Sequence, residues 1–555
     1  MAFALASFLL VLGCGGGSTS SSSSSSASYQ CSSTVTGTPW SPSVTGLSAN
    51  NHDSNVVLSQ TVYQKTGAVT GLAQGTSSRE ISFTIDMSQD LGAYGSLTLM
   101  AQVAKYPSGL QGSAFAFLTS LNDGTNEYVN LSSACGSSGF YQCSNGSCSI
   151  NTSCAPSWPS AFLNRNQYEQ YQGDAISAAN YPSVNIFPTC NWSGGTNGST
   201  TNPSCAFNQT FFPSGYSPPR LRYGVNYTAK YVLVADSYST LSGYQAGINL
   251  TVVKKTSNHG SVGGTVDFNV VLVGNTNVQA SRTAKGQQNL NTLVSNLMTF
   301  YGQSNSSIKF GTVRAVEWPC QTGGDQYSSM VTSELGNMFV SAKNILPSGL
   351  DTTAMNVFLV GTITDDSASA NSNLTILGID GAIGGPAMNG TAISGVAVSS
   401  FNTLDTYNSS CPSSSGICAL NQQDSSFYEL SETVAHEMGH YFRLNHPSES
   451  SGTIHDDIPD TPACTATQSI SGVNYITINS CLNSDSNIFS GTNSTCSANC
   501  GSYSTANGTF CPTATACEFN YIMWWTVKNF YQGNSDGELF SPDEAVVMSY
   551  HPLIQ

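Results

Sequence analysis

A short segment in the C-terminal half of the chain has the residues to hold a metal ion. The stretch AHEMGHYFRLNHP, residues 435–447, places His436 and His440 four positions apart, with Glu437 beside the first. Residues four apart lie on one face of a helix, so both imidazoles can reach one cation while Glu437 takes a proton from a bound water. His446 follows six residues after His440, and a turn would bring it back as a third ligand. Three protein ligands with one open position are what a catalytic zinc ion needs.

This spacing, HExxHxxxxxH, resembles that of the metzincin clan of zinc peptidases. Met523, in NYIMWW, matches the methionine that lies in a tight turn beneath the zinc ligands in that clan. The sequence DTP at residues 460–462, followed by Cys464, is similar to the pappalysin family of metzincins. The resemblance covers roughly residues 265–555 and does not extend to the N-terminal half.

The resemblance implies both a fold and a reaction. The fold is an α+β metzincin-like catalytic domain with a twisted mixed sheet, an active-site helix and an irregular, disulfide-bearing lower subdomain. The reaction is hydrolysis of peptide bonds in extracellular proteins, by zinc-bound water with Glu437 as general base. The implied ligands of Zn²⁺ are His436, His440 and His446, and the implied partners are protein or peptide substrates.

Two positions depart from the metzincin pattern. Arg443 stands where these helices usually turn through glycine, and positive φ at a non-glycine residue costs on the order of 1–2 kcal/mol. Zinc binding contributes about 10 kcal/mol or more at a structural site, so we expect the metal site to survive. Trp525 stands where some metzincins have a tyrosine, and an indole cannot ligate zinc.

The acidic residues after the motif have two interpretations. Asp456, Asp457 and Asp460 could supply oxygen ligands to Ca²⁺, as the resemblance to pappalysins suggests. A solvated acidic loop explains the same residues equally well. Calcium is therefore a second possible cofactor beside zinc.

Both strands and helices are expected to position this motif. Apolar runs predict strands at residues 266–274, 308–318 and 355–364, and helical spacing predicts a helix over 284–303 and the motif helix over 427–442. GPAMNGTAISGVAVSS, residues 385–400, is either the edge strand that aligns substrate above the site or an ordinary internal strand. Near the C-terminus, Ser541, Pro542 and Glu544 form the capping pattern of a short closing helix.

The N-terminal half has a different pattern of apolar and polar residues. Alternating apolar runs between turn residues predict an all-β, jelly-roll-like sandwich over residues 50–257, before the peptidase domain at 265–555. The sandwich is either a binding module or a removable inhibitory propeptide.

The N-terminus predicts export. Residues 1–13 form a short apolar run like a signal peptide, and VLGC resembles a bacterial lipobox in which Cys14 becomes lipidated. Residues 14–49 are rich in Ser and Gly and are expected to be a flexible tether. This predicts a bacterial outer-membrane lipoprotein, held to the membrane through its lipid anchor only. The alternative is an ordinary cleaved signal and a freely secreted protein.

Composition agrees with an exported protein. Only 9% of the residues are charged, and the net charge of −16 argues against nucleic acid as a partner. Without Cys14 the 17 cysteines become 16, an even number that suits disulfides in an oxidising compartment.

Two other functions compete with the peptidase. One is a catalytically silent surface adhesin or carbohydrate-binding protein with a degenerate peptidase domain, for which Arg443 would be the visible sign. The other is a structural zinc domain, which usually closes with a fourth protein ligand.

Overall fold

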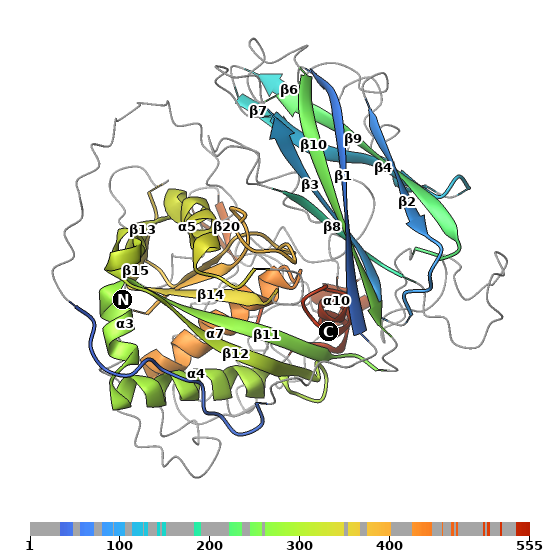
Figure 1. Cartoon of the computed structure of the whole chain (residues 1–555). Helices are drawn as coiled ribbons and strands as arrows, with labels where there is room; N and C mark the ends of the chain where they lie inside the picture. The colour runs from blue at the N-terminus through green and yellow to red at the C-terminus, as the bar shows by residue number, and fades with distance from the viewer. Residues whose placement is uncertain are drawn as a thin grey trace.

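The computed structural model shows a mixed α/β protein in which a β-sandwich lies beside an α/β layer structure (Figure 1). The residues that it describes are 34–47, 56–70, 80–92, 94–105, 114–125, 127–130, 141–144, 147–150, 182–189, 221–235, 245–257, 261–348, 353–366, 375–400, 425–446, 458, 468–470, 473–475, 503–505, 508–510, 522–523 and 540–555.

Among the residues that the structure describes, eight strands form the sandwich. One group of paired strands has the order β1-β10-β3-β8. The other contains β9, which pairs with both β2 and β4, and β5, which pairs with β4. The two groups are joined where the end of β1 pairs in parallel with β9. The strands are β1 (Val56–Thr70), β2 (Ile81–Met87), β3 (Ser96–Lys105), β4 (Ala114–Asn122), β5 (Glu127–Asn130), β8 (Ser183–Pro188), β9 (Val225–Ala235) and β10 (Gln245–Ser257).

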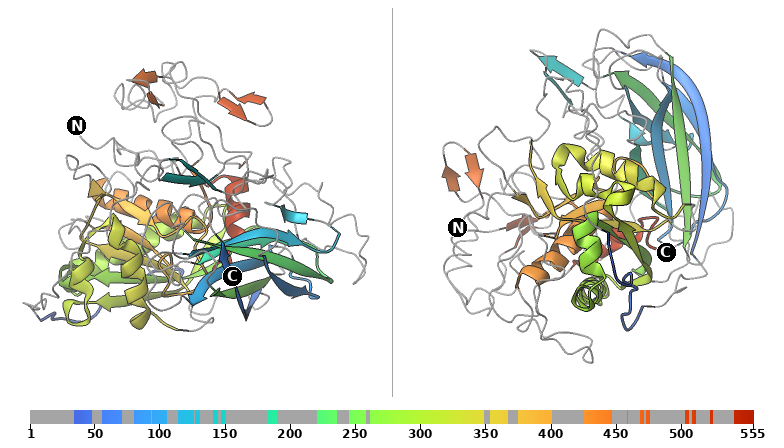
Figure 2. Two further views of the ribbon diagram at one scale, coloured as in Figure 1. Left: turned by 90° about the horizontal axis from the view of Figure 1, so that it is seen from above. Right: turned by 60° about the vertical axis from the view of Figure 1, so that its left-hand side comes forward.

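Period-two alternation builds the core of the sandwich. Every second residue of β2 is buried, and Phe83 packs with Leu99 of β3, Tyr231 of β9 and Leu250 of β10 in one apolar cluster. The intervening residues of β3, β8 and β10 face away from this cluster. Several of them meet the second unit instead, and Figure 2 shows the long strands standing alongside its helices.

The second unit is built on a five-stranded sheet in the order β12-β11-β14-β18-β17. Neighbouring strands are parallel except β17, which is antiparallel to β18. The strands are β11 (Gly264–Val273), β12 (Ile308–Trp318), β14 (Met355–Val360), β17 (Gly378–Asp380) and β18 (Val396–Ser399), and the helices are α3 (Gly274–Ser281), α4 (Ala284–Tyr301), α5 (Leu335–Ser341), α7 (Ser425–Tyr441) and α10 (Pro542–Ser549).

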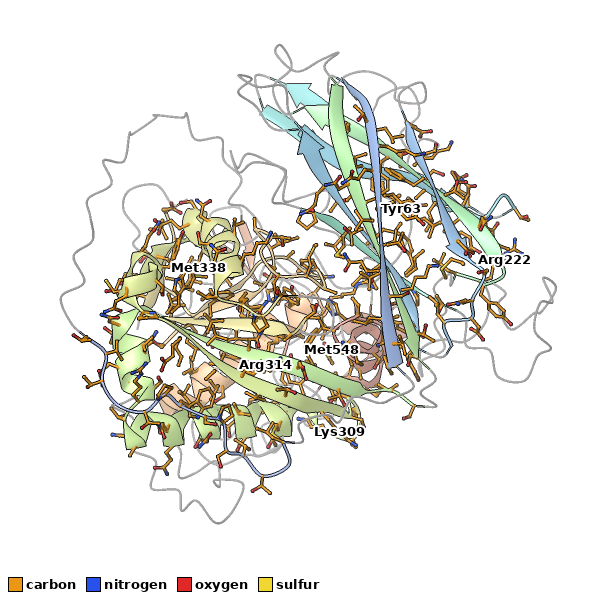
Figure 3. All side chains as sticks on the ribbon, in the orientation of Figure 1. Tyr63, Arg222, Lys309, Arg314, Met338 and Met548 are labelled. Atoms are coloured by element: carbon orange, nitrogen blue, oxygen red, sulfur yellow. The ribbon has the colours of Figure 1, made fainter. Side chains whose placement is uncertain are left out.

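Helices cover both faces of this sheet, which explains why its central strands are continuous apolar runs. Phe268 and Val270 of β11 pack toward α4 and α7. Val271 of the same strand packs on the opposite face toward α5, where Met338 lies (Figure 3).

The edge of the sheet nearest α7 is β17, not the segment 385–400. Val396–Ser399 of that segment forms β18, an internal strand between β14 and β17. Of the two interpretations, the internal strand is therefore confirmed. Residues 385–395 are not part of a strand and belong to the loop that joins β17 to β18.

The motif helix α7 packs on α4 and on the sheet. Tyr301 of α4 donates a hydrogen bond from its hydroxyl to the carbonyl of Ala435, at 2.8 Å. The closing helix α10 begins with the expected capping box, because Ser541 accepts from the Glu544 amide and the Glu544 carboxylate accepts from the Ser541 amide.

Residues 34–47 are not a free tether. Trp40 is 3% exposed and lies in the apolar core with α4, and its Nε1 donates to Asn291 Oδ1 at 3.1 Å. Backbone groups of the segment also bond to the side chains of Gln279, Arg282, Gln287 and Asn291. The expectation of a flexible tether over 14–49 is therefore wrong for this part, because one large apolar side chain and its hydrogen bonds hold the segment.

The remaining described elements are short. They are β6 (Tyr141–Ser144), β7 (Ser147–Ile150), β13 (Ser329–Val331), β15 (Thr362–Thr364), β16 (Thr375–Ile376), β19 (Gln468–Ile470), β20 (Val473–Tyr475), β21 (Tyr503–Thr505), β22 (Gly508–Phe510) and the 3-10 helices η5 (Cys320–Thr322), η6 (Gly324–Tyr327), η7 (Thr332–Glu334) and η8 (Ala342–Asn344). Within the described ranges, no helix is both long and apolar enough to cross a membrane.

Candidate metal centre

The last turns of α7 present two imidazoles side by side. His436 and His440 are one helical turn apart, and their ring centroids lie 4.6 Å from each other with the rings nearly perpendicular. Both residues precede the helix end at Tyr441 by only a few positions. The third histidine must therefore come from the chain that follows the helix.

A left-handed turn brings His446 back to the helix. Arg443 has φ of +89°, its amide donates to the carbonyl of His440 at 2.8 Å, and the amide of Leu444 donates to that of Gly439 at 3.0 Å. These two bonds are those of a Schellman motif, in which glycine normally takes the left-handed position. Arginine at this position costs on the order of 1–2 kcal/mol of backbone strain.

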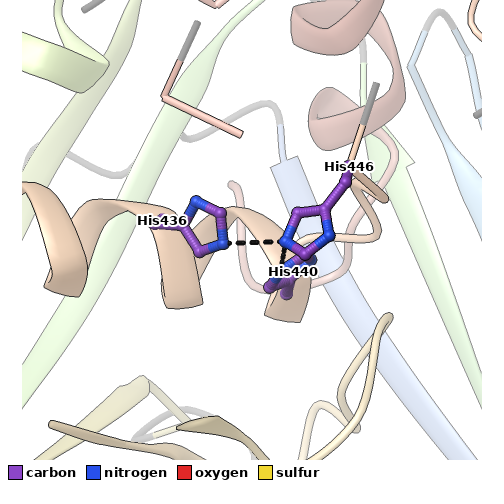
Figure 4. A group of neighbouring side chains, drawn as sticks. All are labelled: His436, His440 and His446. Carbon is purple, nitrogen blue, oxygen red and sulfur yellow. Dashed lines mark hydrogen bonds between the residues drawn. The ribbon is translucent and has the colours of Figure 1, made fainter. Parts of the chain in front are cut away.

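The three imidazoles converge on one point (Figure 4). The Nε2 atom of His446 lies 3.1 Å from Nε2 of His436 and 3.1 Å from Nε2 of His440. A tetrahedral zinc ion with metal-to-nitrogen distances of about 2.0–2.1 Å needs ligand nitrogens about 3.3 Å apart. The spacing of these nitrogens therefore fits zinc.

Carbonyl groups fix the tautomers of two of the rings. Nδ1 of His436 lies 2.7 Å from the carbonyl of Ile522, and Nδ1 of His440 lies 2.7 Å from that of Leu444. A carbonyl only accepts, so each Nδ1 carries the proton and each Nε2 turns a lone pair toward the cluster. Burial, with the neighbouring charge of His446, lowers the pKa of His440 to about 3, which keeps that ring neutral and able to bind a cation.

Glu437 lies against the edge strand β17. It is buried, and its Oε2 atom has no hydrogen-bond partner within the described part of the chain. A Cβ atom on Gly378 of β17 would lie 2.7 Å from Glu437 Cγ, so only glycine permits this close approach. A buried carboxylate with a free oxygen is suited to accept a proton from a water at the metal.

Asp380, at the end of β17, is a second carboxylate at the site. Burial raises the pKa of Asp380, and the nearby His446 partly opposes this shift. Burial also raises the pKa of Glu437, and the negative charge of Asp380 adds to that effect. The sequence carries no spacing signal for Asp380, because a strand edge meets the helix here only through tertiary packing.

Met523 packs directly beneath the helix. It is fully buried, and a Cβ atom on Gly439 would lie only 2.2 Å from its Sδ atom. The neighbouring Ile522 supplies the carbonyl that holds His436. The segment 522–523 therefore contacts the helix between two of the histidines.

Several predicted residues lie outside the described ranges: Cys14, Asp456, Asp457 and Asp460. The lipidation and calcium predictions therefore stay predictions. Among the described residues, the group that could hold a metal consists of His436, His440 and His446, whose ligand atoms lie within 4.8 Å of one another.

The chain matches no protein-family model, and no curated protein matches its sequence. What the protein can do is therefore inferred from its own residues.

Proposed function

We propose that this protein is an exported zinc-dependent endopeptidase that hydrolyses peptide bonds of extracellular proteins. One observation carries the proposal: the Nε2 atom of His446 lies 3.1 Å from those of His436 and His440, and the carboxylate of the neighbouring Glu437 keeps one oxygen free. The resemblance of the same residues to the metzincin and pappalysin pattern supports it. Three nitrogen ligands that leave one position open are typical of catalytic zinc, whereas structural zinc is usually closed by a fourth protein ligand.

The residues divide the work between binding and proton transfer. Bound zinc would lower the pKa of its water to about 7 and polarise the scissile carbonyl. His436 and His440 would hold the ion through Nε2, because their Nδ1 protons are occupied by carbonyl acceptors. Glu437 would take the proton from the attacking water and return it to the leaving amine.

The position of the edge strand β17 favours a polypeptide as the substrate. Its one strand partner among the described residues is β18, and it contacts α7 beside Glu437. An extended peptide can add to such an edge through backbone hydrogen bonds, which hold substrate without regard to its sequence. The scissile bond would then pass the metal.

Export to the cell surface belongs to the same proposal. The apolar run at residues 1–13, the lipobox-like Cys14 and the low charged fraction favour an outer-membrane lipoprotein, with free secretion as the alternative.

The first test separates metal binding from hydrolysis. Wild-type protein, Glu437→Gln and His440→Ala are loaded with zinc, dialysed, and assayed for zinc content and for cleavage of a denatured, fluorescently labelled protein. We expect one zinc per wild-type chain and cleavage of the substrate. Glu437→Gln should bind zinc equally and cleave about 10²–10⁴-fold more slowly, since a general base contributes that much.

His440→Ala is the matched control, because it should lose zinc and cleavage together. A wild-type protein that binds zinc and is as inert as Glu437→Gln would contradict the peptidase and favour a catalytically silent surface protein.

A further inference from the structure

Arg443 leaves the metal-binding turn and reaches the other unit of the protein. Its side chain is 2% exposed, and its Nη1 donates to the carbonyl of Ile186, in strand β8 of the sandwich, at 3.0 Å. Burial lowers the pKa of this guanidinium to about 9. A buried cation is tolerated only where polar groups meet it, and here the sandwich supplies one of them.

The contact surface between the sandwich and the second unit is called the seam below. The loop between β17 and β18 lies in this seam around Arg443. The amides of Gly384 and Gly385 donate to the carbonyls of His440 and Tyr441, both at 2.9 Å, and so close the C-terminal end of α7. A Cβ atom on Gly384 would lie 3.2 Å from Arg443 Cγ. The same loop buries Ala382 and Ile393 against an apolar patch of the sandwich made of Met100, Val184, Ile186 and Val253.

A second buried basic side chain crosses the seam in the opposite direction. Lys255 of β10 donates to the carbonyl of Ser549, at the end of α10, at 2.6 Å. On its own side of the seam, the second unit holds His551, just beyond α10, which donates from Nε2 to the carbonyl of Gly385 in the same unit at 3.0 Å. The two units are therefore joined by polar contacts from both sides as well as by apolar packing.

The conformation of Arg443 explains why these contacts concern the metal. Its left-handed backbone is the one that glycine adopts without strain, yet the chain has arginine there. The carbonyl of Leu444, the next residue, holds Nδ1 of His440, and His446 follows two residues later. Any movement of the arginine backbone would therefore displace two of the three candidate ligands.

We propose that Arg443 is a positioning residue through which the sandwich holds the turn between His440 and His446. The metal centre is then built by both units, and the sandwich is a permanent part of the enzyme rather than a removable propeptide. This inference rests on the proposed function only in taking the three histidines as metal ligands. It does not depend on peptide hydrolysis.

The test measures zinc affinity rather than cleavage. Full-length wild type, Arg443→Gly, Arg443→Lys and Arg314→Gln are titrated with zinc against a chromophoric chelator at pH 7.5, and each is loaded with cobalt to record its visible spectrum. Arg443→Gly relieves the backbone strain and removes the contact with Ile186. Arg314 of β12 (Figure 3) is partly exposed and pairs with Asp267 at 2.9 Å within the second unit, so Arg314→Gln controls for loss of a paired guanidinium elsewhere.

Arg443→Gly should weaken zinc binding about 10- to 100-fold, as loss of a residue that orients ligands does, and should shift the cobalt spectrum. Arg443→Lys keeps the cation and should recover part of the affinity, and it also serves if the glycine variant does not fold. Arg314→Gln should bind zinc as wild type does.

Zinc affinity equal to wild type in Arg443→Gly would overturn the positioning role while leaving the peptidase proposal standing. Conversely, a wild type that binds zinc and cleaves nothing would overturn the peptidase without touching the role of Arg443. A wild type that binds no zinc would overturn both.

Discussion

At the scale of single residues, Gly378 determines how closely β17 approaches the side chain of Glu437. A methyl group there would lie 2.7 Å from both Glu437 Cγ and Thr433 Cγ2. Gly378→Ala should therefore displace the side chain of Glu437 while leaving the three histidines in place. We expect kcat to fall about 10- to 100-fold with unchanged zinc content, since a displacement of about 1 Å can cost that much.

A double variant provides the control for this prediction. Thr433→Ser removes the methyl group that the side chain introduced by Gly378→Ala would meet, and it keeps the hydroxyl. Gly378→Ala combined with Thr433→Ser should regain part of the lost kcat. Wild-type kcat in Gly378→Ala would show that the close approach does not position Glu437.

Some residues of the candidate site can be predicted from the sequence, and others cannot. His436 and His440 could be picked out because the period of a helix places them on one face, and Glu437 because it stands next to the first of them. Arg443 was recognised as an anomaly, but its partner in β8 depends on long-range packing. Asp380 could not be foreseen for the same reason.

At the scale of elements, the segment 34–47 is held by one large side chain. Trp40 is almost fully buried against α4, so Trp40→Ala should lower the free energy of unfolding by about 3–5 kcal/mol, the usual cost of removing a buried tryptophan. Urea unfolding followed by circular dichroism measures this change.

Trp40→Phe separates apolar burial from the hydrogen bond to Asn291. It keeps an aromatic ring and loses the Nε1 donor, so it should cost about 1 kcal/mol for the lost bond, plus a smaller amount for the lost volume. A loss below about 0.5 kcal/mol in Trp40→Ala would mean that the segment is not held in solution, since surface substitutions have effects of that size.

Elements with a strong period were the predictable ones. The structure has α4 over Ala284–Tyr301, β12 over Ile308–Trp318 and the capped α10, all within a few residues of the expected bounds. Composition gave the wrong prediction for residues 34–47: the Ser- and Gly-rich sequence predicts a flexible tether, but the segment packs on the second unit through the buried side chain of Trp40. The place of β18 inside the sheet was also undetermined, because strand order depends on tertiary contacts that local patterns do not record.

At the scale of the whole molecule, the seam between the units makes stability depend on pH. His551 is fully buried there, with Nε2 donating to Gly385 and Nδ1 accepting from the amide of Leu553 at 3.2 Å. Both ring nitrogens are thus used by the neutral form. Burial, with the positive charges of Arg443 and Lys255 close by, lowers the pKa of His551 to about 3.

The direction of the pH effect follows from comparing the folded and unfolded states. In the unfolded chain His551 has its ordinary pKa of about 6.5, so between pH 6.5 and about 3 the unfolded state binds a proton that the folded state does not. The free energy of unfolding should therefore fall as pH falls through this window, by about 1.4 kcal/mol per pH unit from this group, and should be unaffected by it above pH 6.5.

His551→Gln tests this contribution, because glutamine keeps a donor for Gly385 and an acceptor for Leu553 but does not titrate. Urea unfolding of the metal-free protein at pH 7.5, 6.0, 5.0 and 4.5 gives the slope for wild type and variant. The slope below pH 6.5 should be shallower in His551→Gln by about 1.4 kcal/mol per unit. Parallel curves would show that His551 takes up a proton equally in both states, and hence that water reaches the seam between the sandwich and the second unit.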